Sequence, residues 1–418
     1  MQIADIDTSK KRPAVQVGRD SISNDQLLYF TSPSMTANER HLVFISDRSG
    51  QPNLFAWDVL TGEERQLTDN TEGFLKSYIY FNGNPYSGLG KASVSLDVHH
   101  GIVYYIQGRQ ICSVTLDGKR RVLAEYPAGQ MTAYSHVSAD GRRLCVPTID
   151  ALALDADTRL SGRPDYNINE RIRRENLSSW LRVYDTVSGE EVACERIPQA
   201  WVTHVQFSPV DPSIILYNNE WGSETGDEGT RRLWIWDGKA HRRLRTEGDG
   251  RSAGDYCTHE MWERDGSAII YHGAYARRSP EFENLEQYVG RVNADGSGLV
   301  EIPLPRSWDR YGHYTVGNPG EIVTDGYYEE PGDRDPEDKS ERWINGTACI
   351  NGGAWISLLR VDWAKRHIQW VPLCQHGSSW TSQDSHPHPV FNHAADAILF
   401  NSDRNGKRTI YRVETPAE

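Results

Sequence analysis

The chain has 418 residues, of which 38% are hydrophobic and 10% aromatic, and its formal net charge is −13. An acidic surplus of this size argues against a nucleic-acid partner, because nucleic acids are bound through excess Lys and Arg. It leaves room for a small anionic ligand, since a local basic pocket can lie within an acidic protein. No stretch approaches the roughly 20 apolar residues that span a bilayer, so we expect no membrane partner.

The N-terminal segment MQIADIDTSKKRPAVQV contains no apolar run of the kind found in secretory signals. The six cysteines lie far apart and form no CxxC pair. A zinc ribbon or a dense disulfide framework is therefore not expected, and buried thiols are the simpler interpretation. Together these features predict a cytoplasmic protein.

One outline recurs about seven times along the chain: an alternating strand, a turn with Asp and Gly, a second strand, and a polar strand after a further turn. Short strands repeated in groups of four are typical of β-propellers. We therefore expect an all-β fold, a seven-bladed β-propeller. The repeats cover 41–68, 100–123, 140–148 with 181–197, 213–220 with 231–244, 267–275 with 288–302, 320–328 with 354–371, and 396–414.

The seventh repeat is one strand short. A strand around Pro13–Val17 at the other end of the chain could complete it and close the ring. This interpretation makes residues 1–418 a single propeller domain with two loop insertions, at about 150–179 and 329–353. The first insertion is rich in arginine, including Arg173, and could reach over an anionic ligand, although a solvated surface loop is an equal alternative.

Histidine recurs at one position of the repeat. Each repeat opens with a segment resembling F-S-P-D-G, such as FSPVD at 207–211, and the position three residues before its first aromatic or aliphatic residue should lie near the propeller axis. A lone histidine is usually structural, but four of the chain's 14 histidines at equivalent positions indicate one shared cavity. From the second repeat to the seventh, this position holds Lys91, Tyr134, His204, His259, His313 and His388.

A second histidine, His386, lies two residues before His388 in SHPHPVF. On a strand, residues i and i+2 face the same way, so both rings could reach one ion. Gln383 could add an amide oxygen, and His313 comes from the neighbouring repeat. Three imidazoles and one oxygen suit a first-row divalent metal. A hydrogen-bonded histidine cluster without metal is the alternative.

These segments give the chain a resemblance to a known family. The stretches SQDSHPHPVFN (382–392), THEMWERDG (258–266), RRLW (231–234) and the opening 29–55 resemble the oligogalacturonate lyases of polysaccharide lyase family 22. The resemblance covers essentially the whole chain. It implies a seven-bladed propeller that binds a divalent metal, usually manganese (Mn2+), through three histidines and a glutamine.

The resemblance also implies roles for particular residues. The metal ligands would be Gln383, His386, His388 and His313. The catalytic base would be His259, in HEMW where the family more often has HEFW, and an arginine beside that base would be Arg232. Arg231 competes with Arg232, because adjacent side chains on a strand face opposite ways.

The reaction implied is β-elimination on a small acidic oligosaccharide. The metal would stabilise charge on the C6 carboxylate of a galacturonate, and a neutral His259 would remove the C5 proton, giving a 4,5-unsaturated uronide. Arg232 or Lys91 would neutralise another carboxylate. His204 and the arginine-rich insertion with Arg173 are further substrate-contact candidates.

Two other functions remain open on the sequence alone. A related lyase could apply the same chemistry to another uronic-acid oligosaccharide, because pocket loops select the sugar. A non-catalytic interaction scaffold is the other alternative, since NLFAWDV (53–59) and LWIWDG (233–238) look superficially like WD repeats. A scaffold would not need a histidine at four equivalent positions.

Overall fold

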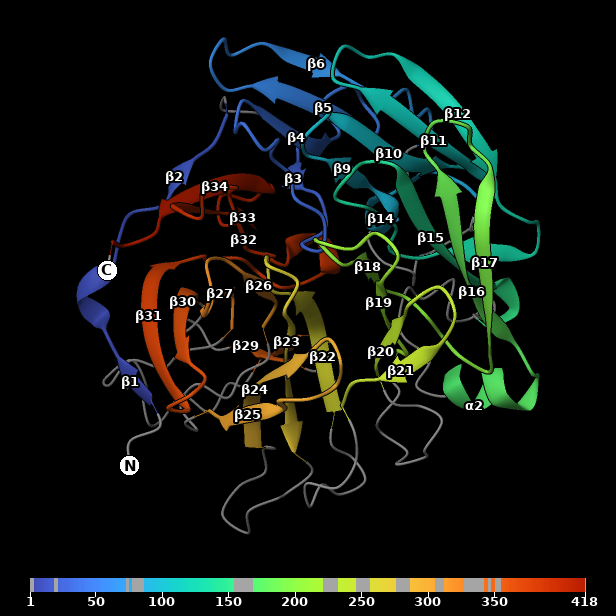
Figure 1. Ribbon diagram of the computed structural model, residues 1–418. Helices are drawn as coiled ribbons and strands as arrows, with labels where there is room; N and C mark the ends of the chain where they lie inside the picture. The colour runs from blue at the N-terminus through green and yellow to red at the C-terminus, as the bar shows by residue number, and fades with distance from the viewer. Residues whose placement is uncertain are drawn as a thin grey trace. The chain divides into compact units, whose positions relative to one another are not determined.

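The computed structural model shows a chain built mostly of short β-strands (Figure 1). The strands belong to two compact units. The four-sheet unit comprises Leu27–Gly222 with Asp227–Arg243, and the three-sheet unit comprises Met1–Gln26, Ser223–Gly226 and Leu244–Glu418. The structure describes residues 4–18, 22–72, 75–76, 86–153, 168–220, 232–245, 256–275, 286–304, 312–326, 342–344, 347–349 and 355–417.

The first two sheets of the four-sheet unit have the strand orders β3-β4-β5-β6 and β12-β11-β10-β8-β7, with β9 also paired to β10. The central pairs β4–β5 and β10–β11 are antiparallel, whereas β7 and β8 run parallel. The strands are β3 (Asp25–Leu27), β4 (His41–Ser46), β5 (Asn53–Asp58), β6 (Glu64–Gln66), β7 (Leu75–Lys76), β8 (Leu89–Gly90), β9 (Ser95–Asp97), β10 (Ile102–Gln107), β11 (Gln110–Thr115) and β12 (Arg120–Glu125).

The other two sheets of this unit have the orders β13-β15-β16-β17, with β14 paired to β15, and β18-β19-β20-β21. Strand β17 alternates between exposed and half-buried residues, as expected of the last strand in its sheet. The strands are β13 (Gln130–Thr132), β14 (His136–Val137), β15 (Arg143–Asp150), β16 (Ser178–Asp185), β17 (Glu191–Pro198), β18 (Val205–Phe207), β19 (Ile215–Asn218), β20 (Leu233–Trp236) and β21 (His241–Arg243).

The three-sheet unit has the orders β22-β23-β24-β25, β1-β31-β30-β27-β26 and β2-β34-β33-β32. Its strands are β1 (Ala4–Ile6), β2 (Val15–Gln16), β22 (Tyr256–Trp262), β23 (Ala268–Tyr275), β24 (Glu286–Asn293), β25 (Val300–Pro303), β26 (Tyr314–Val316), β27 (Glu321–Thr324), β30 (Trp355–Asp362), β31 (His367–Gln375), β32 (Val390–Phe391), β33 (Ala397–Ser402) and β34 (Thr409–Glu414).

The seven larger sheets coincide with the seven repeats expected from the sequence. The N-terminal strand is also confirmed, because β2 pairs antiparallel with β34 through Val15 and Arg412 and supplies the fourth strand of the last sheet. One pairing was not expected: β1 runs parallel to β31, with Ala4 opposite Ile368. The N-terminal segment therefore adds a strand to two sheets.

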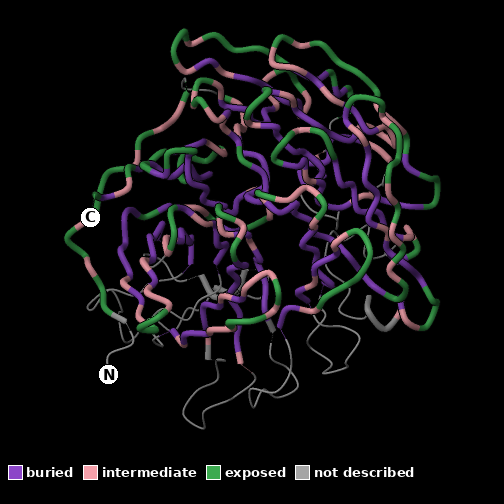
Figure 2. Tube along the Cα trace, viewed as in Figure 1, coloured by how far each residue is buried: buried purple, intermediate pink, exposed green. Residues whose placement is uncertain are grey.

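The core of each unit lies between neighbouring sheets, and the central strands are buried along most of their length (Figure 2). In the four-sheet unit, Val43 of the first sheet belongs to the same fully buried cluster as Val103 and Val114 of the second. In the three-sheet unit, Ile356 packs in one cluster with Phe400. Burying one such side chain stabilises the fold by about 1.5–3 kcal/mol.

The insertions contain regular structure of their own. In the first, η3 (Ala151–Ala153) and the short helix α2 (Ile168–Arg174) flank residues 154–167, which lie outside the described residues. In the second, β28 (Arg342–Ile344) and β29 (Thr347–Cys349) pair as a hairpin. The remaining short helices are η1 (Thr8–Lys10), η2 (Lys91–Ser93) and η6 (Gln383–Ser385). Among the helices described, none combines the length and apolarity needed to cross a bilayer.

Candidate active site

Three histidines of the three-sheet unit form one buried cluster. One ring nitrogen from each of His313, His386 and His388 lies within 4.8 Å of the other two, and no ring is more than 4% exposed. Nε2 of His388 lies 3.1 Å from Nε2 of His313. Two imidazole lone pairs at this distance require either a shared proton or a cation. The cluster is thus a suitable binding site for a divalent cation.

The backbone brings the two C-terminal histidines together differently from the sequence prediction. His386 follows the short helix η6, and His388 has a left-handed φ of 47°, so neither belongs to a strand; β32 begins only at Val390. The expectation that strand alternation aligns these rings was therefore wrong. A left-handed backbone costs about 1–3 kcal/mol at a residue other than glycine, and such strain concentrates at functional sites.

Gln383 fits the same donor set. It opens η6, whose N-terminus is fixed by reciprocal hydrogen bonds between Ser382 and Ser385. Its Oε1 is buried and accepts no hydrogen bond within the described part of the chain. A buried amide oxygen without a hydrogen bond is unfavourable unless another group binds it. The amide oxygen and the three imidazoles together suit a divalent first-row metal.

Asp325, just after β27, organises this cluster. Its Oδ2 accepts hydrogen bonds from Nδ1 of His313 at 2.9 Å and from the backbone N–H of His388 at 3.1 Å. Burial by itself raises the pKa of the Asp325 carboxyl, but the neighbouring His313 ring and its hydrogen bonds hold that pKa below its usual value. An ionised carboxylate places the proton of His313 on Nδ1, which leaves the Nε2 lone pair for a metal.

His259 lies beside this cluster, with its ring centroid 4.7 Å from that of His313. It occupies an irregularity of β22 between Thr258 and Met261 and has a left-handed φ of 53°. Its Nδ1 lies 2.8 Å from the carbonyl oxygen of Gly312 and 2.7 Å from Nε2 of His272. Because a carbonyl can only accept, Nδ1 of His259 carries the proton and Nε2 keeps the lone pair.

The Trp380 ring packs against the histidine cluster. Its ring centroid lies 4.4 Å from that of His386 and 5.6 Å from that of His313. Trp380 is 4% exposed and has a left-handed φ of 54°. An indole at this place excludes water from one side of the imidazoles, which strengthens electrostatic interactions within the cluster.

The other predicted residues belong to the four-sheet unit. Arg232 is buried and its Nη1 donates to Oε1 of Glu220 at 2.9 Å. The His204 ring stacks on that of Tyr134, with centroids 4.2 Å apart and planes at 8°. Arg231, the competitor of Arg232, lies outside the described residues.

Lys91 and Arg173 are placed differently from each other. Lys91 opens η2 and is fully buried, whereas Arg173 lies in α2 and is half-buried. Lys91 follows Gly90, which pairs with a second buried lysine, Lys76. Burial lowers the pKa of Lys76 to about 8.

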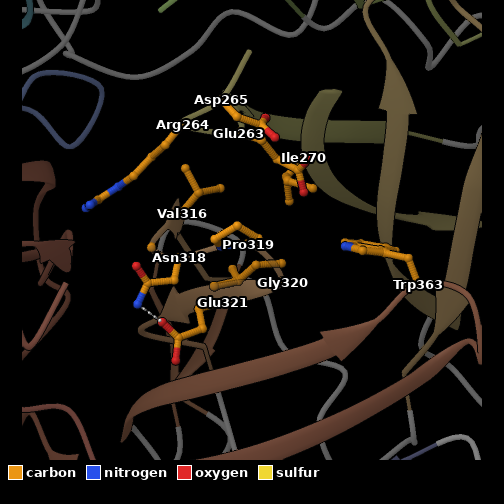
Figure 3. Close-up of a pocket in the computed structure, with 12 residues that line it drawn as sticks. Glu263, Arg264, Asp265, Ile270, Val316, Asn318, Pro319, Gly320, Glu321 and Trp363 are labelled. Atoms are coloured by element: carbon orange, nitrogen blue, oxygen red, sulfur yellow. Dashed lines mark hydrogen bonds between the residues drawn. The ribbon is translucent and has the colours of Figure 1, made fainter. Parts of the chain in front are cut away.

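A hollow on the three-sheet unit shares no residue with the predicted site (Figure 3). Glu263, Arg264 and Asp265 lie on one side of it, and Glu321 and Trp363 line it elsewhere. Its carboxylates already have partners, since Glu263 pairs with Arg291 and Glu321 accepts from Asn318. It therefore offers no set of donors comparable to the histidine cluster.

The fold and the cluster define a β-propeller with a histidine-rich centre suited to a divalent metal. The chain belongs to the oligogalacturonate lyase family, whose family model matches residues 176–418, more than half of the chain.

Two relatives are similar over part of their length. The oligogalacturonide lyase of Pectobacterium atrosepticum is 25% identical over 248 residues, which cover 56% of this chain and 54% of the relative. The oligogalacturonate lyase of Dickeya dadantii is 26% identical over 231 residues, covering 52% and 50%. The chain thus spans about half the length of the curated relatives it matches.

Two solved structures are similar over nearly the whole chain. An oligogalacturonate lyase in complex with manganese has a TM-score of 0.71 at 19% identity, with 97% of both chains covered. An oligogalacturonate lyase from Vibrio parahaemolyticus has a TM-score of 0.70 at 19% identity, covering 97% of this chain and 99% of that one. These likenesses confirm the seven-bladed β-propeller fold.

Three residues of the site were missed by the sequence reasoning: Asp325, His272 and Glu220. The register of two β-hairpins would have predicted Asp325 and His272. Tyr314 pairs with Thr324, which places His313 opposite Asp325, and Thr258 pairs with His272 next to His259. Glu220 has no comparable signal, because its partners come from two separate segments.

Proposed function

We propose that this chain is an oligogalacturonate lyase, which cleaves short oligogalacturonides by metal-dependent β-elimination and leaves 4,5-unsaturated uronides. The buried cluster of His313, His386 and His388 is the observation that carries this proposal. Membership of the oligogalacturonate lyase family and the names of the relatives support the substrate class.

The cation would be held by His313, His386, His388 and Gln383. When bound, it supplies Lewis-acid stabilisation of the negative charge that develops on the uronate carboxylate. We propose Mn2+ because one structurally similar lyase is a complex with manganese. Asp325 keeps the Nε2 lone pair of His313 directed at the cation site by accepting from Nδ1.

His259 is the proposed base that removes the C5 proton. Its Nδ1 proton lies between two acceptors, the Gly312 carbonyl oxygen and Nε2 of His272. The base nitrogen is therefore Nε2, whose lone pair can receive the proton. The left-handed backbone at His259 supports a functional role for this ring position.

Basic residues of the four-sheet unit are the proposed substrate contacts. Arg232 would bind a uronate carboxylate by charge-assisted hydrogen bonds, which an arginine forms in a fixed planar geometry. Lys91, His204 and Arg173 would contact other parts of the oligosaccharide. The substrate is a small acidic sugar, so buried basic groups on a chain of net charge −13 are the expected means of binding it.

We also propose that the protein is cytoplasmic. Five cysteines with described side chains carry no disulfide, and four of them are buried. Reduced thiols of this kind are usual in reducing compartments. Fractionation of the source cells followed by immunodetection would test the location, and recovery from an extracellular fraction would contradict it.

The experiment that tests the activity is an ultraviolet absorbance assay for the conjugated unsaturated product. Purified protein is incubated with digalacturonate or trigalacturonate, with chelator and then with added Mn2+. We expect an absorbance rise that the chelator abolishes and Mn2+ restores. No rise with metal bound would indicate another uronide as substrate, and no rise without bound metal would favour an interaction scaffold.

A further inference from the structure

The carboxylate of Glu220 joins Arg232 and His204, two of the basic residues of the four-sheet unit that we assign to the substrate. Glu220 follows β19 and is 6% exposed. Its backbone N–H donates to the carbonyl of Trp201 at 2.8 Å, and the N–H of the preceding residue, Asn219, donates to the carbonyl of Arg232 at 2.9 Å. These bonds fix the Glu220 backbone between the Trp201 and Arg232 segments.

One oxygen of this carboxylate holds Arg232. Nη1 of Arg232 donates to Oε1 of Glu220 at 2.9 Å, and both side chains are buried. This contact uses one of the five N–H donors of a guanidinium. This charge-assisted hydrogen bond aligns one amino group of the guanidinium with the carboxylate.

The other oxygen holds the His204 segment. Oε2 of Glu220 accepts from the hydroxyl of Thr203 at 2.6 Å and from Nδ2 of Asn218 at 2.8 Å. Asn218 in turn accepts the backbone N–H groups of Thr203 and His204 on its Oδ1, at 2.9 and 2.8 Å. These bonds place the amide nitrogen of Asn218 toward the carboxylate.

The same network orients the His204 ring. Nδ1 of His204 lies 2.8 Å from Oγ1 of Thr203 and 3.4 Å from Oε2 of Glu220. Nδ1 of His204 also lies 3.0 Å from Nδ2 of Asn218, so this ring nitrogen is within hydrogen-bond distance of both side chains that donate to Glu220. The ring is also held in plane by its stack on Tyr134.

Glu220 stays ionised in this setting. Burial raises the pKa of its carboxyl, but the charge of Arg232 and hydrogen bonds from His204 and Thr203 hold that pKa well below its usual range. A permanent carboxylate between two basic side chains keeps both in one arrangement at every working pH.

We propose that Glu220 is a positioning residue that fixes Arg232 and His204 as one substrate-binding unit through the two oxygens of its carboxylate. This inference rests on the proposed function of Arg232 and His204. Without this carboxylate, Arg232 would lose the acceptor Oε1 and Thr203 and Asn218 would lose the acceptor Oε2, so a uronate would have to supply more of the ordering of both side chains on binding.

The matched control is Glu301, a second buried glutamate with an arginine partner. Nε of Arg245 donates to its Oε1 at 2.9 Å, and Glu301 has no part in the proposed chemistry. Glu220→Gln and Glu301→Gln each leave a buried arginine facing a neutral amide. We expect both variants to lower the thermal midpoint by a comparable amount, and only Glu220→Gln to change substrate binding.

The first arm is nuclear magnetic resonance with 15N-labelled arginine, which does not depend on turnover. The Arg232 guanidinium signal is assigned by its loss in Arg232→Lys. We expect slow rotation of this guanidinium in the wild type and in Glu301→Gln, and fast rotation in Glu220→Gln. Unchanged rotation in Glu220→Gln would overturn the proposal.

The second arm is steady-state kinetics on digalacturonate with Mn2+. We expect Glu220→Gln to lower kcat/KM by about 10- to 100-fold, mainly through a higher KM. In the double variant, Glu220→Gln should lower kcat/KM by no more than about 2-fold beyond the loss caused by Arg232→Lys, because both changes disrupt the same substrate-binding unit. A loss in the double variant equal to the product of the two single losses would contradict the positioning role of Glu220. A wild type without turnover but with slow Arg232 rotation would refute the proposed function alone.

Discussion

Asp325 and His313 are joined twice: the backbone N–H of His313 donates to Oδ1 at 2.6 Å, and its ring Nδ1 lies 2.9 Å from Oδ2. Both residues are at most 3% exposed. The paired contacts set the position of the His313 backbone and the tautomer of its ring together. Because Oδ2 also accepts from the backbone of His388, one carboxylate orders two of the three clustered histidines.

Asp325→Asn should weaken metal binding by about 10- to 100-fold, because an amide can donate to Nδ1 and so favour the wrong tautomer of His313. Competition with a chelator of known affinity measures the effect. Asp97→Asn is the matched control, since Asp97 is likewise buried and lies 2.8 Å from Nδ1 of His100 in the four-sheet unit. Equal metal affinity in the Asp325 variant and the wild type would contradict this role.

His259→Ala should reduce kcat by about 10²- to 10⁴-fold while metal content stays near that of the wild type, since His259 is the base and not a ligand in our assignment. The absorbance assay and elemental analysis measure the two properties. His241→Ala, at an exposed position of the edge strand β21, should retain activity. Near-normal turnover of the His259 variant would exclude it as the base.

Gln383→Ala and His386→Ala should each lose metal and activity together, because each removes a proposed ligand from a small donor set. Elemental analysis after extensive dialysis shows the metal loss. His393→Ala, an exposed histidine close in sequence, serves as the control. Unchanged metal content in either ligand variant would remove that residue from the ligand set.

His376 should make stability fall in acid. It is fully buried, desolvation lowers its pKa to about 4, and the backbone N–H of Ser378 donates to its Nδ1. The unfolded chain binds a proton near pH 6.5, whereas the folded chain binds one only near pH 4. The contribution of His376 to the free energy of unfolding is therefore fully present above pH 6.5. Up to about 3 kcal/mol of this free energy is lost as the pH falls to 4.

The test is urea unfolding of the wild type and His376→Asn between pH 7 and pH 4.5. Asparagine keeps an acceptor for the Ser378 N–H but does not titrate. We expect a smaller loss of unfolding free energy in the variant over this interval. Identical pH dependence in the two proteins would show that His376 is protonated equally in both states.

Deletion of residues 1–20 should destabilise the three-sheet unit by at least about 2 kcal/mol. It removes β1 and β2 together with the backbone bonds Asp7 to Trp370, Arg12 to Leu373 and Val17 to Ile410. Thermal unfolding compares this deletion with removal of residues 1–3, which leaves β1 in place. An unchanged midpoint would show that the N-terminal strands are dispensable.

Much of the fold was predictable because five of the seven larger sheets consist of strands that are consecutive in the chain. In these sheets, strand alternation and turn residues indicate the blade without long-range information. The pairing of β2 with β34 was predictable only because the last repeat lacked a strand. The parallel pairing of β1 with β31 had no such signal, since no repeat was visibly incomplete there.

The site was predictable to the extent that it follows the repeat. The equivalent position gave His204, His259, His313 and His388, and the structure brings His313 and His388 together and places His259 beside them. His386 does lie beside His388, but the reason given for it was wrong, because the HPH segment is not a strand. The left-handed backbone at His388 depends on its tertiary surroundings, which a local propensity does not contain.

The sequence by itself determined the seven-sheet architecture and the residue types of the site, because repeat period, turn chemistry and side-chain identity are local properties. Tertiary structure alone decided which atoms can act. The proton on Nδ1 of His313 is set by Asp325, that on Nδ1 of His259 by the Gly312 carbonyl, and the orientation of Arg232 by Glu220. Hydrogen bonds of this kind require separate segments to meet in a buried setting, where an unmatched donor or acceptor is costly.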